Sequence, residues 1–100
     1  MRLTQFEIDT IKELALLHFG KKVQVYLFGS RASDNKRGGD IDLFIRNKNG
    51  DSLSVYSKIK FITDLIIQIG EQKIDVVLDN PERRGTEFLN TIYHTGIQLC

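Results

Sequence analysis

The sequence YLFGSRASDNKRGGDIDLFI, residues 26–45, decides the fold. Its first apolar run stops at Gly29-Ser30, a polar and basic loop follows, and a second apolar run opens with Asp40 and Asp42. Because side chains alternate between the two faces of a strand, both aspartates point the same way. Adjacent carboxylates repel each other, and a divalent cation is the usual reason for such a pair. Backbone N–H groups at a Gly-Ser turn can hold a phosphate, so the stretch predicts a site for metal and triphosphate.

A third carboxylate gains meaning from its setting. Asp75 lies inside the otherwise apolar run KIDVVL, residues 73–78. A buried carboxylate without a partner is costly, so Asp75 should pair with Lys73 or Arg46, or bind a cation. If its strand lies beside that of the first two aspartates, three carboxylates meet on one sheet face and suit Mg²⁺ or Mn²⁺. Two such ions, roughly 3.5–4 Å apart, can clamp the attacking and leaving oxygens of a displacement at phosphorus.

Each part of this pattern has an ordinary explanation when it is taken alone. A Gly-Ser pair is a common turn, and Asp-x-Asp after Gly-Gly is often a solvated strand edge. The further ligands and the closing Glu of a calcium-binding EF-hand loop are missing. The joint occurrence of the three parts favours a functional site. Arg31, Lys36 and Arg37 are candidates for neutralising the triphosphate, and the sequence does not rank them.

Helical and strand periodicities alternate along the chain. Thr4 and Glu7 form a predicted capping box, and Gly20 ends the helix that follows it. A final helix beginning at Asn80-Pro81 is expected to bury Phe88, Leu89, Ile92 and Tyr93. The predicted elements are a helix ending at Gly20, strand 23–28, a turn or short helix 30–36, strand 40–46, helix 53–69 capped by Ser52, strand 73–78, the final helix, and a short strand or tail at 97–100. This order predicts an α+β domain, a small mixed β-sheet with helices packed on one face.

The length and composition of the chain indicate one globular domain, residues 1–100. Of its residues 41% are hydrophobic and 27% charged, which argues against disorder. A net charge of +1 provides no general basic field, so the sequence does not favour direct nucleic-acid binding. Cys100 is the single cysteine, which excludes an intrachain disulfide. No apolar run approaches the roughly 20 residues that span a bilayer, so a cytoplasmic location and no membrane association are expected.

The combined motif resembles that of the DNA polymerase β-like nucleotidyltransferase superfamily. That motif is a Gly-Ser pair, here Gly29-Ser30-Arg31, then acidic residues alternating with apolar ones, here Gly39 to Leu43, then a carboxylate on a later strand, here Asp75. The small size is most similar to the minimal, MntA-like nucleotidyltransferases of bacteria and archaea. The resemblance covers nearly the whole chain and implies a mixed sheet with helices against it.

The resemblance also implies residue roles and a reaction. Gly29 and Ser30, with Arg31 and Gly39 of the same motif, would bind the nucleotide triphosphate. The catalytic and metal-binding residues would be Asp40 and Asp42, which hold two Mg²⁺ ions, and Asp75, which completes the ion near the nucleophile and helps to deprotonate it. The implied reaction transfers a nucleoside monophosphate, usually AMP from ATP, to a hydroxyl and releases pyrophosphate.

The sequence shows no second domain to grip the base or the acceptor, so we expect another chain to supply the acceptor. The resemblance implies a helical HEPN-type protein, with this chain acting as the antitoxin that adds AMP to a HEPN tyrosine. An alternative is a binding module that neutralises its partner by contact alone. Nucleic-acid elongation shares the chemistry but lacks a basic, aromatic-lined surface. Apolar surface exposed on the last helix would favour a homo-oligomer.

Overall fold

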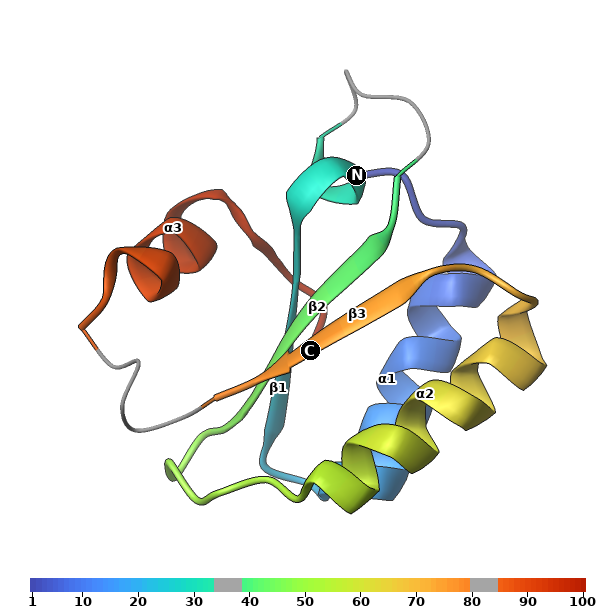
Figure 1. The fold of residues 1–100 in the computed structure, drawn as a ribbon, viewed down its shortest axis with the longest axis horizontal. Coiled ribbons are helices and arrows are strands. Elements are labelled where there is room, and N and C mark those ends of the chain that lie inside the picture. The colour runs from blue at the N-terminus through green and yellow to red at the C-terminus, as the bar shows by residue number, and fades with distance from the viewer. Residues whose placement is uncertain (34–38, 80–84) are drawn as a thin grey trace.

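The computed structural model describes residues 1–33, 39–79 and 85–100. Its elements are α1 (Gln5–Phe19), β1 (Val23–Phe28), the 3₁₀ helix η1 (Gly29–Ala32), β2 (Ile41–Asn47), α2 (Val55–Ile69), β3 (Ile74–Leu78), α3 (Glu87–Thr95) and β4 (Ile97–Gln98) (Figure 1). The candidates Lys36 and Arg37, and the predicted helix start at Asn80-Pro81, lie outside the described residues. The described helix begins at Glu87 and is capped by Thr86.

The four strands form one mixed sheet in the order β3-β2-β1-β4. β1 pairs antiparallel with β2 and with β4, whereas β2 pairs parallel with β3. The register sets Phe28 opposite Asp42 and Asp42 opposite Asp75 across three neighbouring strands. The predicted α+β class and mixed sheet are therefore confirmed, and the predicted short strand after residue 96 is β4.

One face of the sheet is covered by α1 and α2. The strand residues that point to this face include Val25, Leu27, Leu43 and Ile45, which are all fully buried. They pack with Phe61 and with other buried side chains of the two helices in the main core of the domain. Burial of this much apolar surface, at about 25 cal/mol per Å², is the main stabilising contribution to the fold.

The opposite face is covered by α3, and this corrects the expectation that all helices lie on one face (Figure 1). Phe44 is fully buried there against Leu89 and Ile92 of α3, with Tyr26 and Phe28 packed around them. Apolar strand residues lie on both faces of the sheet, so both faces must be packed against other elements. The predicted buried stripe of α3 is correct for Leu89 and Ile92 and wrong for Phe88 and Tyr93.

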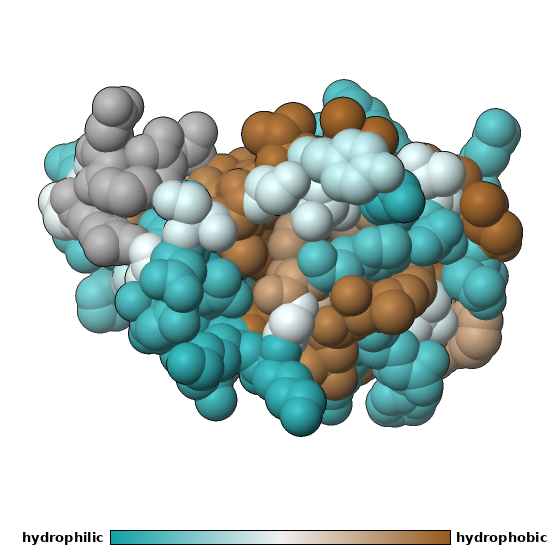
Figure 2. Space-filling model, turned by 90° about the horizontal axis from the view of Figure 1, so that it is seen from below, coloured by the Kyte–Doolittle hydropathy of each residue, from teal (hydrophilic) through white to brown (hydrophobic). Residues whose placement is uncertain are grey.

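The two aromatic residues of that stripe reach solvent. Phe88 is 38% and Tyr93 43% exposed, whereas Leu89 and Ile92 are buried. Large apolar side chains are also exposed on α1 and α2, Leu17 and Ile67 to 72% each. Hydrophobic surface is visible at the end of the molecule where α1 ends and α2 begins (Figure 2). Within the described residues no helix combines the length and the apolar character that crossing a membrane requires.

A side chain caps the N-terminus of each long helix, at the predicted residue in α1 and at a different residue in α2. Thr4 accepts a hydrogen bond from the Glu7 N–H at 3.1 Å, and the Glu7 carboxylate accepts one from the Thr4 N–H at 2.9 Å, so the capping box is confirmed. α2 is capped by Ser54, whose hydroxyl accepts from the Ser57 N–H at 3.3 Å, and not by Ser52 as predicted. Two serines close together offer equivalent caps, and the packing of α2 selects between them.

Replacement of Thr4 by alanine should lower the free energy of unfolding by about 1 kcal/mol, because the first turn of α1 loses its cap. Urea unfolding followed by far-UV circular dichroism measures the change. Thr4→Ser keeps the hydroxyl and should unfold at the wild-type midpoint. An alanine variant as stable as the wild type would show that the cap contributes nothing.

Candidate active site

Three carboxylates converge at one end of the sheet, on the face that α3 covers. Asp40 directly precedes β2, Asp42 is the second residue of β2, and Asp75 is the second residue of β3. Each offers an oxygen, and the three oxygens lie within 4.8 Å of one another. The parallel register of β2 and β3 brings Asp75 to this place, since it pairs Asp42 with Asp75. Asp75 is exposed and the other two are half-buried.

The Gly29-Ser30 corner lies directly against these acids. Gly29 has φ +74°, and a Cβ added to it would overlap the Asp42 carboxylate. Gly39 has φ +91°, and a Cβ added there would overlap the Ser30 hydroxyl. Both positions therefore need glycine for conformation and for space. The structure brings together Gly29, Ser30, Gly39 and the three aspartates, as the sequence predicts.

Two arginines, Arg31 and Arg2, stabilise the Gly29-Ser30 corner through hydrogen bonds. The Arg31 guanidinium donates to the carbonyl of Gly39 at 3.3 Å, the carbonyl of Arg2 at 3.1 Å and the side chain of Gln72 at 3.2 Å. Arg2 in turn donates to the carbonyl of Ser33 at 3.0 Å and of Ser30 at 2.9 Å. These bonds span the chain from its first residues to the loop before β3. They give Arg31 a bracing role, and its contact with phosphate stays a prediction.

Sequence reasoning missed Arg2 and the partner of Lys73. The Lys73 ammonium lies 3.3 Å from a carboxylate oxygen of Asp40, not on Asp75, and its side chain is 72% exposed. The hydrogen bond to Asp40 and the charge of that carboxylate raise the pKa of Lys73. Arg46, the other predicted partner of Asp75, donates to the Tyr93 hydroxyl at 3.1 Å. Lys73, two residues before Asp75, was the sequence signal for an ion pair with an acid of the site. The pairing of β2 with β3 decides which of the acids this lysine reaches.

The site concentrates negative charge beyond what one lysine neutralises. Partial burial raises the pKa of Asp42, and the neighbouring charges of Asp75 and Asp40 raise it further. Such a cluster holds carboxylates in an unfavourable state that a divalent cation relieves. Oxygen ligands converging within 4.8 Å on one exposed edge fit Mg²⁺ or Mn²⁺, which take substrate phosphates and water as remaining ligands.

Residues 9–100 match the family described as "Polymerase beta, Nucleotidyltransferase". The chain belongs to this nucleotidyltransferase family. The match extends over nearly the whole domain and includes the glycine-serine corner and all three acids of the site. The nucleotidyltransferase family generally uses a divalent metal and a nucleotide, which agrees with the carboxylate cluster.

The fold of this nucleotidyltransferase is shared with a chain from a solved complex. That chain comes from the crystal structure of a toxin–antitoxin MntA–HpeT mutant that carries two aspartate-to-glutamate substitutions. The TM-score is 0.67 at 21% sequence identity, and the match covers 93% of this chain and 71% of the other. A search of curated proteins found no match.

The raised pKa of Asp42 predicts that Asp42→Asn stabilises the nucleotidyltransferase when divalent cations are absent. A carboxyl with a raised pKa favours the folded state at low pH, and this contribution is lost as the pH rises through the folded pKa. At pH 7 the free energy of unfolding of the neutral asparagine variant should therefore exceed that of the wild type by roughly 0.5–1 kcal/mol, the usual size of interactions between partly exposed charges. The gain should shrink as the pH falls towards the ordinary aspartate pKa.

Urea unfolding in EDTA, at several pH values from 7 downward, measures this gain. Asp51→Asn is the matched control, because Asp51 is an exposed aspartate in the turn beyond the other end of β2. The control should show no gain at any pH. An Asp42→Asn protein that is less stable than the wild type at pH 7 in EDTA would contradict the prediction.

Proposed function

We propose that this chain is a divalent-cation-dependent enzyme that transfers AMP from ATP to a hydroxyl group of a protein partner. One observation carries the proposal. Three carboxylate oxygens lie within 4.8 Å of one another, directly against a glycine-serine corner that only glycine at position 29 permits. The site thus combines ligands for cations with a backbone turn that can hold phosphate.

Asp40, Asp42 and Asp75 would hold the cations, Mg²⁺ or Mn²⁺. When bound, the cations supply neutralisation of the triphosphate charge and polarisation of the α-phosphate. The N–H groups and hydroxyl of the Gly29-Ser30 corner bind and orient the terminal phosphates. Because phosphoryl-type transfer depends mainly on positioning and electrostatics, few further groups are needed.

Asp75 is the acid best placed to receive a proton, because it is the exposed one of the three. The acceptor oxygen forms a new bond to the α-phosphorus, and the bond from that phosphorus to the bridging oxygen breaks. Pyrophosphate leaves with the electron pair, and the hydroxyl proton passes to Asp75. The Lys73 ammonium, 3.3 Å from Asp40, offsets part of the negative charge of the three carboxylates before cations and substrate bind.

The proposed acceptor belongs to a helical HEPN-type protein, with this chain as the antitoxin of the pair. The structural likeness to a chain from a toxin–antitoxin complex supports this assignment. Contact neutralisation without transfer is the alternative. It accounts less well for the acids, because a purely binding domain gains nothing from three repelling carboxylates. Nucleic-acid elongation also accounts less well for a chain with a net charge of only +1.

Asp42→Asn should abolish transfer of label from α-³²P-ATP to the proposed HEPN-type partner, because the site loses a shared carboxylate ligand. Asp51→Asn, which changes an exposed aspartate outside the site, should retain wild-type labelling. γ-³²P-ATP should give no labelled protein, since the terminal phosphates leave. Neutralisation of the partner without retained label would support the contact alternative, and full labelling by Asp42→Asn would overturn the metal role.

Mg²⁺ should raise the melting temperature of the wild-type protein, because binding to the folded state alone shifts unfolding by mass action. At a Mg²⁺ concentration ten times the dissociation constant the shift corresponds to about 1.4 kcal/mol. Asp42→Asn should lose most of this response. Differential scanning fluorimetry at constant ionic strength, with NaCl replacing MgCl₂, tests it, and an equal shift in both proteins would contradict a site at these acids.

A further inference from the structure

Lys73 places a positive charge at the acidic end of the sheet. The register pairs Ile41 with Ile74. Lys73 and Asp40 each come one residue earlier, so they stand side by side on neighbouring segments. The Ile41 N–H donates to the Lys73 carbonyl at 3.0 Å, which fixes the backbone that carries the lysine side chain. Because Lys73 and Asp75 are two residues apart, both side chains leave the chain on the face of the acids.

The Lys73 ammonium interacts with all three acids. It lies 3.3 Å from a carboxylate oxygen of Asp40. The hydrogen bond to Asp40 and the charge of that carboxylate raise the pKa of Lys73, and the charges of Asp75 and Asp42 raise it further. The side chain is therefore positively charged at neutral pH. Because like charges repel, it opposes the approach of a divalent cation to the same carboxylate.

The ion pair between Lys73 and Asp40 is easily broken. The lysine side chain is 72% exposed and the aspartate side chain 37% exposed. Exposed ion pairs are weak, and dissolved salt screens them. A divalent cation carries twice the charge of an ammonium and prefers carboxylate oxygens as ligands. Such a cation should therefore displace the ammonium from Asp40.

The nucleotide phosphates offer the displaced ammonium a second anionic partner. The Gly29-Ser30 corner contacts the acids from the side of β1, since a Cβ added to Gly29 would overlap the Asp42 carboxylate. Lys73 approaches the same acids from the side of β3. Neighbouring strands are only about 4.7–4.9 Å apart. Phosphates that extend from the corner over the acids thus come within reach of a flexible lysine side chain.

We propose that Lys73 pairs with Asp40 in the free protein and transfers to a phosphate of the nucleoside triphosphate when a divalent cation binds. This inference rests on the proposed function, because it takes the cations to bind the acids and the phosphates to bind the corner. Lys73 is then a positioning residue with two successive partners. Cation binding frees the ammonium for the phosphates, so each of the two ligands strengthens the binding of the other.

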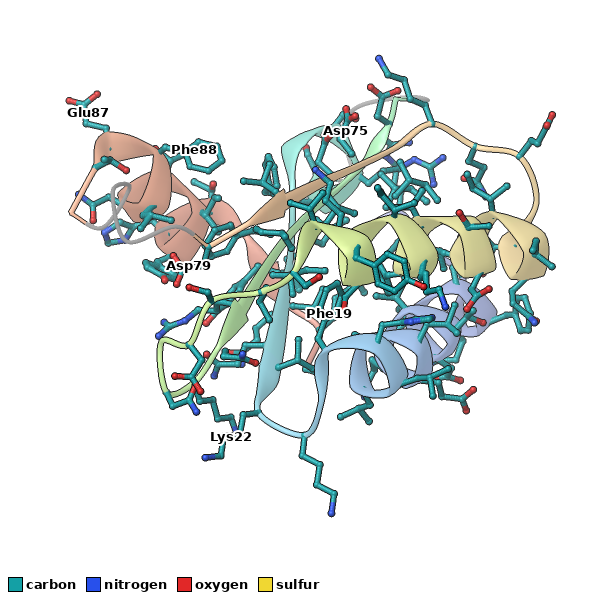
Figure 3. The ribbon with its side chains drawn as sticks, turned by 60° about the horizontal axis from the view of Figure 1, so that its bottom comes forward. Phe19, Lys22, Asp75, Asp79, Glu87 and Phe88 are labelled. Atoms are coloured by element: carbon teal, nitrogen blue, oxygen red, sulfur yellow. The ribbon has the colours of Figure 1, made fainter. Side chains whose placement is uncertain are left out.

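Lys48 provides a matched control at the opposite end of the sheet. It is exposed and directly follows β2, whereas Asp40 directly precedes that strand. Its N–H donates to the carbonyl of Lys22 at 2.8 Å. Figure 3 shows Lys22 and Asp75 at opposite ends of the sheet. Lys48→Gln therefore removes the same charge as Lys73→Gln, but far from the acids.

Mn²⁺ binding without nucleotide tests the first partner. Electron paramagnetic resonance of free Mn²⁺ gives the dissociation constant at fixed ionic strength. Lys73→Gln should bind Mn²⁺ about fivefold more tightly than the wild type, because the competing ammonium is gone. The gain should shrink as NaCl is raised. Lys73→Arg keeps the charge and should show no gain, and neither should Lys48→Gln.

Isothermal titration of inorganic tripolyphosphate and of ATP, both in saturating Mg²⁺, tests the second partner. Lys73→Gln should weaken both ligands about fivefold and to the same extent, because the lost contact is with phosphate. Lys48→Gln should bind both ligands like the wild type. Circular dichroism of each variant checks that the fold is retained. A lysine with a merely structural role would not move the two affinities in opposite directions.

An Mn²⁺ affinity that is unchanged or lower in Lys73→Gln would overturn the proposal. Tighter Mn²⁺ binding with unchanged tripolyphosphate affinity would overturn it too, because Lys73 would then have a single partner. Weaker ATP binding with unchanged tripolyphosphate binding would assign the lysine to the nucleoside and contradict the proposal as well.

The transfer reaction and the role of Lys73 fail in different ways. If labelled AMP is never transferred but Lys73→Gln shifts the two affinities in opposite directions, the role of Lys73 stands and the transfer reaction falls. If transfer proceeds and Lys73→Gln leaves both affinities unchanged, the reaction stands and the role of Lys73 falls.

Discussion

The parallel pairing of β2 with β3 is the constraint on which the site depends. It sets Asp42 beside Asp75, two residues 33 positions apart in the sequence. A slip of one residue would turn every side chain of β3 to the other face and move the third carboxylate into the main core. The fully buried Ile41, Leu43 and Ile45 on β2, with Ile74 and Val76 on β3, oppose such a slip. The apolar core thus fixes the geometry of a polar site that lies on the other face.

The same arrangement explains how repelling acids are tolerated. Three carboxylates within 4.8 Å are unfavourable without a counter-charge, and the raised pKa of Asp42 reflects this. The strands are held by cores on both faces, one with α1 and α2 and the other with α3. Conformational relaxation that would separate the acids would expose one of these cores. Packing energy therefore maintains a preorganised cluster, as catalysis at phosphorus requires.

Much of this could be read from local sequence patterns. The period of two around Ile41 aligned Asp40 with Asp42, and the charge inside KIDVVL identified Asp75. The side of the sheet that α3 covers was missed, although Tyr26, Phe28 and Phe44 share one parity and needed a cover. The partner of Lys73 and the brace by Arg2 could not be predicted, because both depend on how segments distant in the sequence meet. Ser52 and Ser54 are chemically equivalent caps, so only packing distinguishes them.

Hydrogen bonds from Arg2 connect the first residues of the chain to the Gly29-Ser30 corner. Its backbone N–H donates to the Arg31 carbonyl at 2.8 Å, and its side chain reaches the carbonyls of Ser30 and Ser33. An amino-terminal extension that displaced this arginine, or proteolytic trimming that removed it, would loosen the corner while leaving every acid in place.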